Sequence, residues 1–161
     1  MIKVLFLCHG NICRSPMAEY IMKYLVKLAG MKDDYDITSA GVSNEEEGND
    51  IYPPAKRTLI QHNIPFSRHR AHLVSEAEMR AADYIVVMDK WNLRNLGYKY
   101  GNKYNDKIKM LLSFCGDDEE VSDPLWTRDF ERAYDDIYRG CESMLTALSG
   151  KVKKVEKTKN G

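Results

Sequence analysis

Apolar runs that suit buried strands alternate along this chain with segments of helical periodicity. The clearest strand patterns are Ile2–Cys8, which is almost continuously apolar, and the YIVVM run at Tyr84–Met88. Continuous apolar runs of this length are typical of strands that are buried on both faces of a parallel sheet. Because parallel strands need crossover connections, the alternation predicts an α/β fold with helices covering the sheet.

The remaining patterns place the other elements. We expect strands at 35–40 and 107–114, helices at 16–28, 54–62 and 92–96, and a helical turn at 75–80. Ser15 is a suitable cap for the first helix, and Pro16 suits its first position. The polar segments 43–50 and 97–106 predict loops. A long C-terminal helix is predicted from the apolar residues that recur on one face, namely Phe130, Tyr134, Ile137, Cys141, Met144 and Leu148.

Length and composition limit the domain organisation and the partners. A chain of 161 residues with 43% apolar residues suits one domain at 1–150, followed by a lysine-rich tail at 151–161 that we expect to be disordered. The formal net charge is zero, which provides no general attraction to nucleic acid. No apolar run approaches the ~20 residues of a membrane span, and no signal-peptide pattern is present, so we expect a cytoplasmic protein without membrane insertion.

The four cysteines, Cys8, Cys13, Cys115 and Cys141, form no Cys-x-x-Cys pair. Since only four histidines stand beside them, this spacing argues against a zinc site, and we expect neither a metal nor a cofactor. In a reducing cytosol the cysteines are expected to be free thiols. Cys115 and Cys141 fit plain apolar positions.

The segment between the first strand and the first helix has the composition of an anion site. Gly10 permits a tight turn, and Arg14 can offer two parallel hydrogen bonds to a tetrahedral oxyanion. Backbone N–H groups in such a turn, together with the N-terminus of the following helix, attract phosphate. A cysteine placed there ionises readily, so Cys8 is expected to be a thiolate nucleophile beneath the phosphate, with Ser15 able to hydrogen-bond its sulfur. The plainer interpretation of Cys8 is a buried apolar thiol.

This loop, LCHGNICRSPMAE, resembles the signature of the low-molecular-weight protein tyrosine phosphatases. Further segments follow in the order and spacing of that family: SAGVS at 39–43, HRA at 69–71, DYIVVMD at 83–89 and SDP at 122–124. The resemblance extends over residues 2–148. It implies a three-layer α/β sandwich in which a four-stranded parallel sheet of flavodoxin-like order 2-1-3-4 has helices on both faces.

The resemblance also implies roles for individual residues. Cys8 is the implied nucleophile, Arg14 the phosphate clamp and Asp123 the general acid, although taken alone Asp123 is equally suited to capping a helix. Asp89 and Asn92 resemble a supporting pair at the end of the sheet, or a cap of the next helix. The implied phosphate-binding loop comprises His9, Gly10, Asn11, Ile12, Cys13, Arg14 and Ser15, supported by Ser39 and His69.

The mouth of the implied site departs from the family pattern. His9 follows the nucleophile where the family often has an apolar or small residue, and Glu45 stands where an aromatic residue is usual. Leu125 and Trp126 replace a frequent pair of tyrosines, so Trp126 and Trp91 are candidates for an aromatic wall. The three glutamates at 45–47 either favour basic over acidic peptides or belong to a solvated loop that contacts no substrate.

Cys13 has two interpretations. In the family the equivalent thiol can form a reversible disulfide with the nucleophile, which implies the same for Cys13 and Cys8. Alternatively, Cys13 is a thiol that packs under the loop.

The expected activity is hydrolysis of phosphotyrosine and other aryl phosphate monoesters through a cysteinyl-phosphate intermediate. The expected partners are phosphotyrosine proteins or peptides, and the chain is expected to be a monomer or at most a weak dimer. Protein-arginine phosphatases resemble this loop but carry threonine at the position of Ile12. Thiol-dependent arsenate reductases need relay cysteines in the middle of the chain, where 15–114 has none. A phosphate-binding module without catalysis would not need Cys8, Arg14 and Asp123 together.

Overall fold

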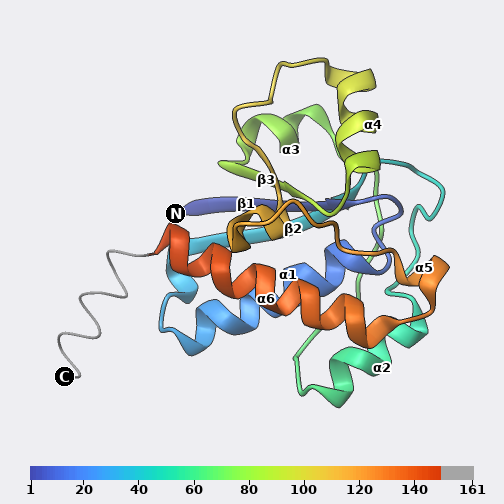
Figure 1. The fold of residues 1–161 in the computed structure, drawn as a ribbon, viewed down its shortest axis with the longest axis vertical. Coiled ribbons are helices and arrows are strands. Elements are labelled where there is room, and N and C mark those ends of the chain that lie inside the picture. The colour runs from blue at the N-terminus through green and yellow to red at the C-terminus, as the bar shows by residue number, and fades with distance from the viewer. Residues whose placement is uncertain (150–161) are drawn as a thin grey trace.

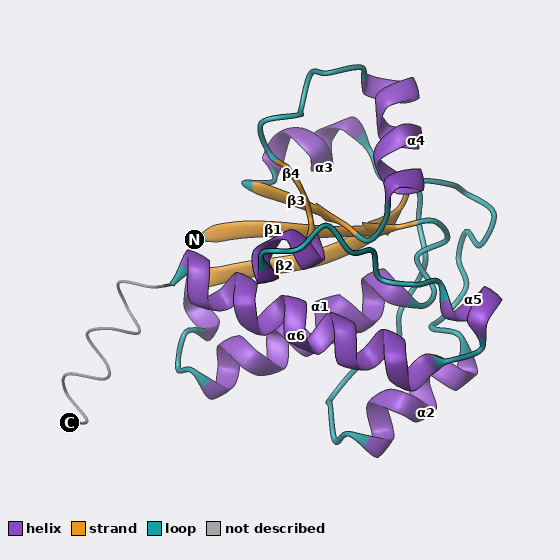
Figure 2. Ribbon diagram, viewed as in Figure 1, coloured by secondary structure: helices purple, strands orange, loops and turns teal. Residues whose placement is uncertain are grey.

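The computed structural model describes residues 1–149, so the tail predicted at 151–161 lies outside the described residues. The strands are β1 (Ile2–Cys8), β2 (Tyr35–Gly41), β3 (Tyr84–Val87) and β4 (Ile108–Met110). The α-helices are α1 (Arg14–Leu28), α2 (Pro53–Gln61), α3 (Glu76–Ala81), α4 (Lys90–Tyr100), α5 (Pro124–Thr127) and α6 (Phe130–Leu148). Two short 3₁₀ helices, η1 (Lys32–Asp34) and η2 (Leu111–Cys115), complete the fold, whose elements are shown in Figures 1 and 2.

The four strands form one parallel sheet in the order β2-β1-β3-β4, which confirms the predicted topology. β1 lies in the middle, where Val4 pairs with Ile37 on one side and with Tyr84 on the other. The strand order therefore reverses beside β1. Ligands of open α/β sheets bind at such a reversal, beyond the carboxyl ends of the strands. Cys8, the last residue of β1, lies at this position.

Side chains of β1 alternate between two cores because successive strand residues point to opposite faces. Val4 and Phe6 pack in the larger core with residues of α1 and α6. Leu5 and Leu7 pack in the smaller core, which includes Met79 of α3 and Leu96 of α4. Figure 1 shows α1 and α6 on one side of the sheet and α3 and α4 on the other, so the three-layer arrangement is confirmed. Among residues 1–149, no helix is both long and apolar enough to span a bilayer.

The prediction of a strand at 107–114 is wrong from residue 111 onwards. β4 covers only Ile108–Met110, and the chain then continues as the 3₁₀ helix η2. The Ser113 hydroxyl donates to the Met110 carbonyl over 2.6 Å, which supports this turn. Leu111 and Leu112 are buried because η2 packs against α6. A short apolar run cannot distinguish a strand from a buried helical turn, which explains the error.

Two helix starts also differ from expectation. α1 begins at Arg14, so Ser15 lies inside the helix and does not cap it, and Pro16 is its third residue. The Ser15 hydroxyl is instead used in the loop beside Cys8. α4 begins after Asp89, whose side chain accepts from the Asn92 N–H, and continues to Tyr100, into the segment predicted as a loop.

Close contact between η2 and α6 depends on a glycine. A Cβ atom on Gly140 of α6 would lie 2.5 Å from Cγ of Leu111, closer than packed carbon atoms approach. Gly140 therefore permits η2 to lie directly on the helix.

Candidate active site

The loop of residues 9–13 turns the chain from β1 into α1 above Cys8. Its carbonyl groups are engaged outside the loop. The Cys8, His9, Asn11 and Ile12 carbonyls accept from Val42 N, Ser43 N, His69 Nε2 and Tyr52 N. Within the described part of the chain, the N–H groups of residues 10–13 have no acceptor. These donors form a concave nest at the N-terminus of α1, the arrangement that binds phosphate.

Asn11 fixes the shape of this loop from its centre. It is fully buried and adopts φ 61°, a left-handed conformation that asparagine tolerates better than most residues. Its side-chain amide donates to Ser15 Oγ over 2.8 Å and to Ser39 Oγ over 3.1 Å, and its Oδ1 accepts from His72 N. Its carbonyl accepts from His69 Nε2 over 2.7 Å, which places the His69 proton on that nitrogen. Ser39 and His69, the two residues expected to support the loop, both contact Asn11.

Glu19 extends this network and was not predicted. The Ser39 hydroxyl donates to Glu19 Oε1 over 2.6 Å, so its oxygen is free to accept from Asn11. Glu19 Oε2 in turn accepts from Lys23 Nζ over 2.5 Å. Nothing in the sequence distinguishes this glutamate from the exposed acids of other helices. Only the packing of α1 against β2 reveals it.

Gly41 allows the second loop to approach the first. A Cβ atom there would lie 3.0 Å from the His9 carbonyl oxygen and 3.3 Å from Cβ of Asn11. Any larger residue would therefore push the loop away from the end of β1.

Arg14 is almost completely buried, with 2% of its surface exposed. Its Nη1 donates to Asp89 Oδ2 over 2.7 Å and to the Val121 carbonyl over 2.8 Å. Burial alone would lower the pKa of Arg14, but the negative charges of Cys8, Asp89 and Asp123 outweigh it and raise the pKa. Arg14 therefore stays charged, and Asp89 both caps α4 and aims the guanidinium, a contact that the sequence did not reveal.

Asp123 is held at the start of α5, opposite the loop. Its Oδ1 accepts from the Leu125 N–H over 3.0 Å, and its Oδ2 lies 3.5 Å from Arg14 Nη2. Asp123 therefore caps a helix, as one interpretation of the sequence expected, and it also lines the cavity above Cys8.

The two thiols of the loop differ in their surroundings. Cys8 Sγ lies 3.0 Å from Ser15 Oγ, so the hydroxyl can stabilise a charge on the sulfur. Burial, followed by the charges of Cys8 and Asp123, raises the pKa of Cys13, so this thiol is protonated at neutral pH. Both cysteines are free thiols in this structure.

A small cavity of ≈ 60 Å³ opens above the loop. Of the predicted mouth residues, Glu45 and Leu125 line it, and Glu46 joins them. Glu45 Oε2 lies 3.1 Å from His9 Nε2 across the mouth. The full lining comprises Cys8, His9, Gly10, Ile12, Cys13, Arg14, Glu45, Glu46, Asp123 and Leu125.

The two tryptophans that were candidates for an aromatic wall lie in exposed positions. Trp126 is 87% exposed and Trp91 is 65% exposed, and neither lines the cavity. The Trp91 ring instead lies under the Arg94 guanidinium, 4.7 Å from its carbon. Leu125, the neighbour of Trp126 in the short helix α5, lines the cavity, whereas Trp126 does not. Residues 1–149 hold no group of three or more His, Cys, Asp or Glu side chains placed to bind a metal ion.

This strand-end thiol under an anion-binding loop places the chain in the class of cysteine-dependent phosphatases. The model of the low molecular weight phosphotyrosine protein phosphatase family matches residues 3–156. The chain belongs to that family.

Several relatives are similar along almost their whole length. The low molecular weight protein-tyrosine-phosphatase YfkJ of Bacillus subtilis is 37% identical over 92% of this chain and 96% of its own, and its crystal structure matches with a TM-score of 0.89. The structure of SP-PTP from Streptococcus pyogenes is 34% identical, covers 92% of this chain and 93% of its own, and has a TM-score of 0.84. The structure of the Drosophila arginine phosphatase DARP is 33% identical, covers 91% of this chain and 98% of its own, and has a TM-score of 0.83.

Proposed function

We propose that this chain hydrolyses phosphotyrosine in proteins, with Cys8 as the nucleophile. The observation that carries the proposal is the position of the Cys8 thiol at the base of a cavity lined by unpaired N–H donors, Arg14 and Asp123. The nest and the guanidinium hold the phosphate oxygens, which places phosphorus above the sulfur.

In the first step the Cys8 thiolate attacks phosphorus. A P–S bond forms while the bond between phosphorus and the phenol oxygen breaks. Protonated Asp123 donates its proton to the departing oxygen, so tyrosine leaves as the neutral phenol. Arg14 stabilises the negative charge that accumulates on the equatorial oxygens in the transition state. Its guanidinium needs no rearrangement for this, because Asp89 and the Val121 carbonyl already hold it in place.

In the second step water attacks the phosphocysteine. Asp123, now a carboxylate, accepts a proton from the water, the P–S bond breaks, and phosphate and the Cys8 thiolate are released. The Ser15 hydroxyl, 3.0 Å from the sulfur, stabilises the departing thiolate. No redox step and no co-reactant other than water is required.

The walls of the cavity favour a flat aromatic group. Ile12 and Leu125 offer apolar surface at the mouth, which suits a phenol ring better than a guanidinium. Arginine phosphatase activity is the second candidate, because DARP shares the fold and 33% of the sequence. The apolar Ile12 supports the first candidate.

The test compares a phosphotyrosine peptide with phosphoarginine and phosphoserine peptides of the same sequence, in EDTA. We expect turnover of phosphotyrosine at least about a hundredfold faster than of either other peptide, since a pocket built for one group rejects others strongly. Cys8→Ser is expected to abolish turnover. Cys115→Ser, which lies outside the cavity, is the matched control and should retain it.

Faster turnover of phosphoarginine would contradict the proposed substrate and leave the nucleophile intact. Undiminished turnover by Cys8→Ser would overturn the mechanism itself.

A further inference from the structure

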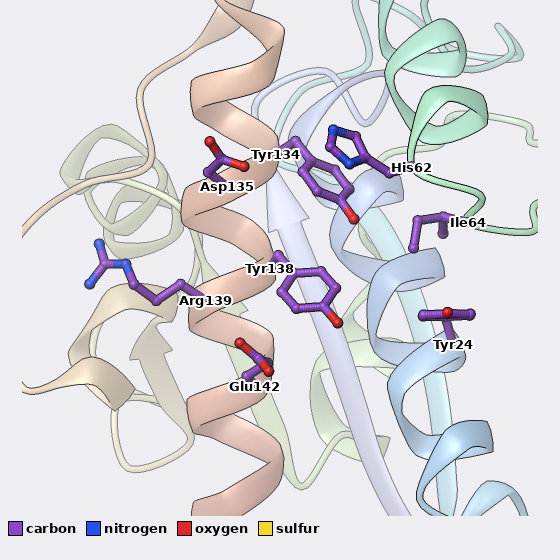
Figure 3. A pocket seen from close by; sticks show the side chains of 8 residues that line it. All are labelled: Tyr24, His62, Ile64, Tyr134, Asp135, Tyr138, Arg139 and Glu142. Atoms are coloured by element: carbon purple, nitrogen blue, oxygen red, sulfur yellow. The ribbon is translucent and has the colours of Figure 1, made fainter.

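A second and larger hollow lies on the face of the molecule formed by α1, α6 and the end of α2. Its volume is ≈ 490 Å³, and we call it the aromatic groove. It is lined by Tyr24, His62, Ile64, Tyr134, Asp135, Tyr138, Arg139 and Glu142, none of which lines the active-site cavity. In Figure 3 the Tyr134 and Tyr138 rings lie on the side of α6 that faces α1, with Tyr24 opposite them.

The rings are arranged so that flat faces border the groove. The His62 ring stacks on Tyr134 with centroids 3.8 Å apart and an interplanar angle of 9°. Tyr138 follows at 5.8 Å from Tyr134, tilted by 35°. Tyr134 and Ile64 are buried and form the floor, whereas Tyr24 and Tyr138 remain half-exposed. The faces of aromatic rings carry partial negative charge and attract cations.

Carboxylates add to this negative potential. Asp135 and Glu142 line the groove, and Glu131 Oε2 lies 2.8 Å from His62 Nε2 at its end. Burial, then the neighbouring Tyr138, Tyr24 and Asp135, raises the pKa of Tyr134 to about 12. Within residues 1–149, the hydroxyls of Tyr24, Tyr134 and Tyr138 make no hydrogen bond. These hydroxyls are available for hydrogen bonds with a ligand.

The one permanent cation among the lining residues is already occupied. Arg139 Nη1 lies 3.2 Å from Asp117, and its Nη2 lies 3.6 Å from Asp136 and 3.8 Å from Glu119. Figure 3 shows its guanidinium directed away from the three tyrosine rings. The groove therefore presents aromatic faces, hydroxyls and carboxylates, and its imidazole, His62, already lies against Glu131.

We propose that the aromatic groove binds a lysine- or arginine-bearing segment of a partner protein. Charge complementarity selects this occupant: a basic side chain can lie over the half-exposed Tyr24 and Tyr138 rings, and Asp135 and Glu142, which also line the groove, supply negative charge. An acidic segment would be repelled by Asp135 and Glu142, and Arg139 is already paired with other carboxylates. Because no lining residue is shared with the cavity above Cys8, binding here is separable from catalysis.

The test measures fluorescence anisotropy of a labelled peptide of repeated Lys-Gly-Ser units, titrated with the full chain at low salt. A Glu-Gly-Ser peptide of the same length is the charge control. We expect the basic peptide to bind, more weakly as salt is added, and the acidic peptide to remain free. Tyr138→Ala and the pair Asp135→Asn with Glu142→Gln are each expected to weaken binding about tenfold.

Matched variants distinguish binding in the groove from non-specific attraction of the basic peptide to other negative charges on the protein. Tyr138→Phe keeps the ring face and should bind like the parent chain, as should Asp33→Asn on the exposed helix η1. Hydrolysis of p-nitrophenyl phosphate should be unchanged in all of these variants, which reports that the fold is intact.

Four results would overturn the proposal. The first is that the basic and the acidic peptide bind equally well. The second is that Tyr138→Ala binds the basic peptide as tightly as the parent chain does. A dimer detected by light scattering that dissociates in Tyr138→Ala would make the groove an interface between copies. Tighter peptide binding after Lys151, Lys153 and Lys154 are replaced by glutamine would identify the chain's own end as the occupant.

Discussion

At the scale of single residues, Asp123 combines two tasks that one substitution can separate. Its Oδ1 caps α5 through the Leu125 N–H, while its Oδ2 lies near Arg14. Asparagine also caps helices well, so Asp123→Asn keeps the local fold and removes the acid. We expect kcat for phenyl phosphate to fall about 10²–10³-fold, because phenolate is a poor leaving group without a proton.

The leaving group supplies the control for this prediction. p-Nitrophenolate departs readily without protonation, so kcat of Asp123→Asn for p-nitrophenyl phosphate should fall much less. Steady-state rates with both substrates test this. Equal losses for the two substrates would mean that Asp123 does not protonate the leaving group.

Ser39 connects the buried Glu19 to Asn11, and its loss should loosen the phosphate loop. Ser39→Ala removes the acceptor for Asn11 Nδ2 at 3.1 Å and the donor to Glu19 at 2.6 Å. We expect kcat to fall about ten- to a hundredfold, since small misplacements of a nest are costly in the transition state.

The matched control is Ser67→Ala, which loses a hydrogen bond with Tyr20 outside the loop and should keep full activity. Kinetics of both variants with p-nitrophenyl phosphate test the prediction. Equal activity of Ser39→Ala and the parent chain would refute the role of the network.

The residues of the candidate site were predictable from sequence only where they lie close together in the chain. Cys8, Arg14 and the loop between them lie in one short segment, so spacing alone indicates an anion site. The contacts of Arg14 with Asp89 and with the Val121 carbonyl span 75 and 107 positions of sequence. Such contacts depend on tertiary packing, and no local pattern reports them. For the same reason the sequence could not show that Trp126 is exposed and lies outside the lining of the cavity.

At the scale of elements, alanine substitution of two helical glycines should change the free energy of unfolding in opposite directions. Gly140→Ala places a Cβ 2.5 Å from Leu111, so we expect the free energy of unfolding to fall by about 1–3 kcal/mol through overpacking. Gly97→Ala in α4 meets nothing within 4 Å and should raise it by about 0.5–1 kcal/mol through helix propensity. Urea denaturation of both variants measures the difference. Equal stabilities would contradict the packing of η2 on α6.

Elements with strong periodicity or continuous apolar character were predicted well, and weak ones were not. β1, β3 and α6 lie where their patterns indicate, because burial on both faces or on one face leaves a long signature. η2 and α5 are short, and their conformations depend on α6 and on the Asp123 cap. The start of α1 shifted because Ser15, a residue typical of caps, is needed beside Cys8 instead.

At the scale of the whole molecule, Asp50 links stability to pH. Burial would raise its pKa, but hydrogen bonds from Lys56, His69 N and Ile51 N outweigh this and lower the pKa to about 2. Its contribution to stability is therefore present above the unfolded pKa of about 3.9 and is lost as pH falls towards 2.

We expect the urea midpoint of the parent chain to fall more steeply between about pH 4 and pH 2 than that of Asp50→Asn. Asp36→Asn, an exposed carboxylate on β2, is the control and should follow the parent chain. Parallel pH profiles for the parent and Asp50→Asn would contradict the role of Asp50.

The central claim concerns one covalent bond, between Cys8 and phosphorus. The most direct measurement mixes the chain rapidly with p-nitrophenyl phosphate, quenches with acid in the first turnover, and determines the mass of the peptide that contains Cys8. We predict a gain of one HPO₃ unit on Cys8, formed with a burst of p-nitrophenol, and no gain in Cys8→Ser. Steady turnover with no adduct on Cys8 would contradict the mechanism.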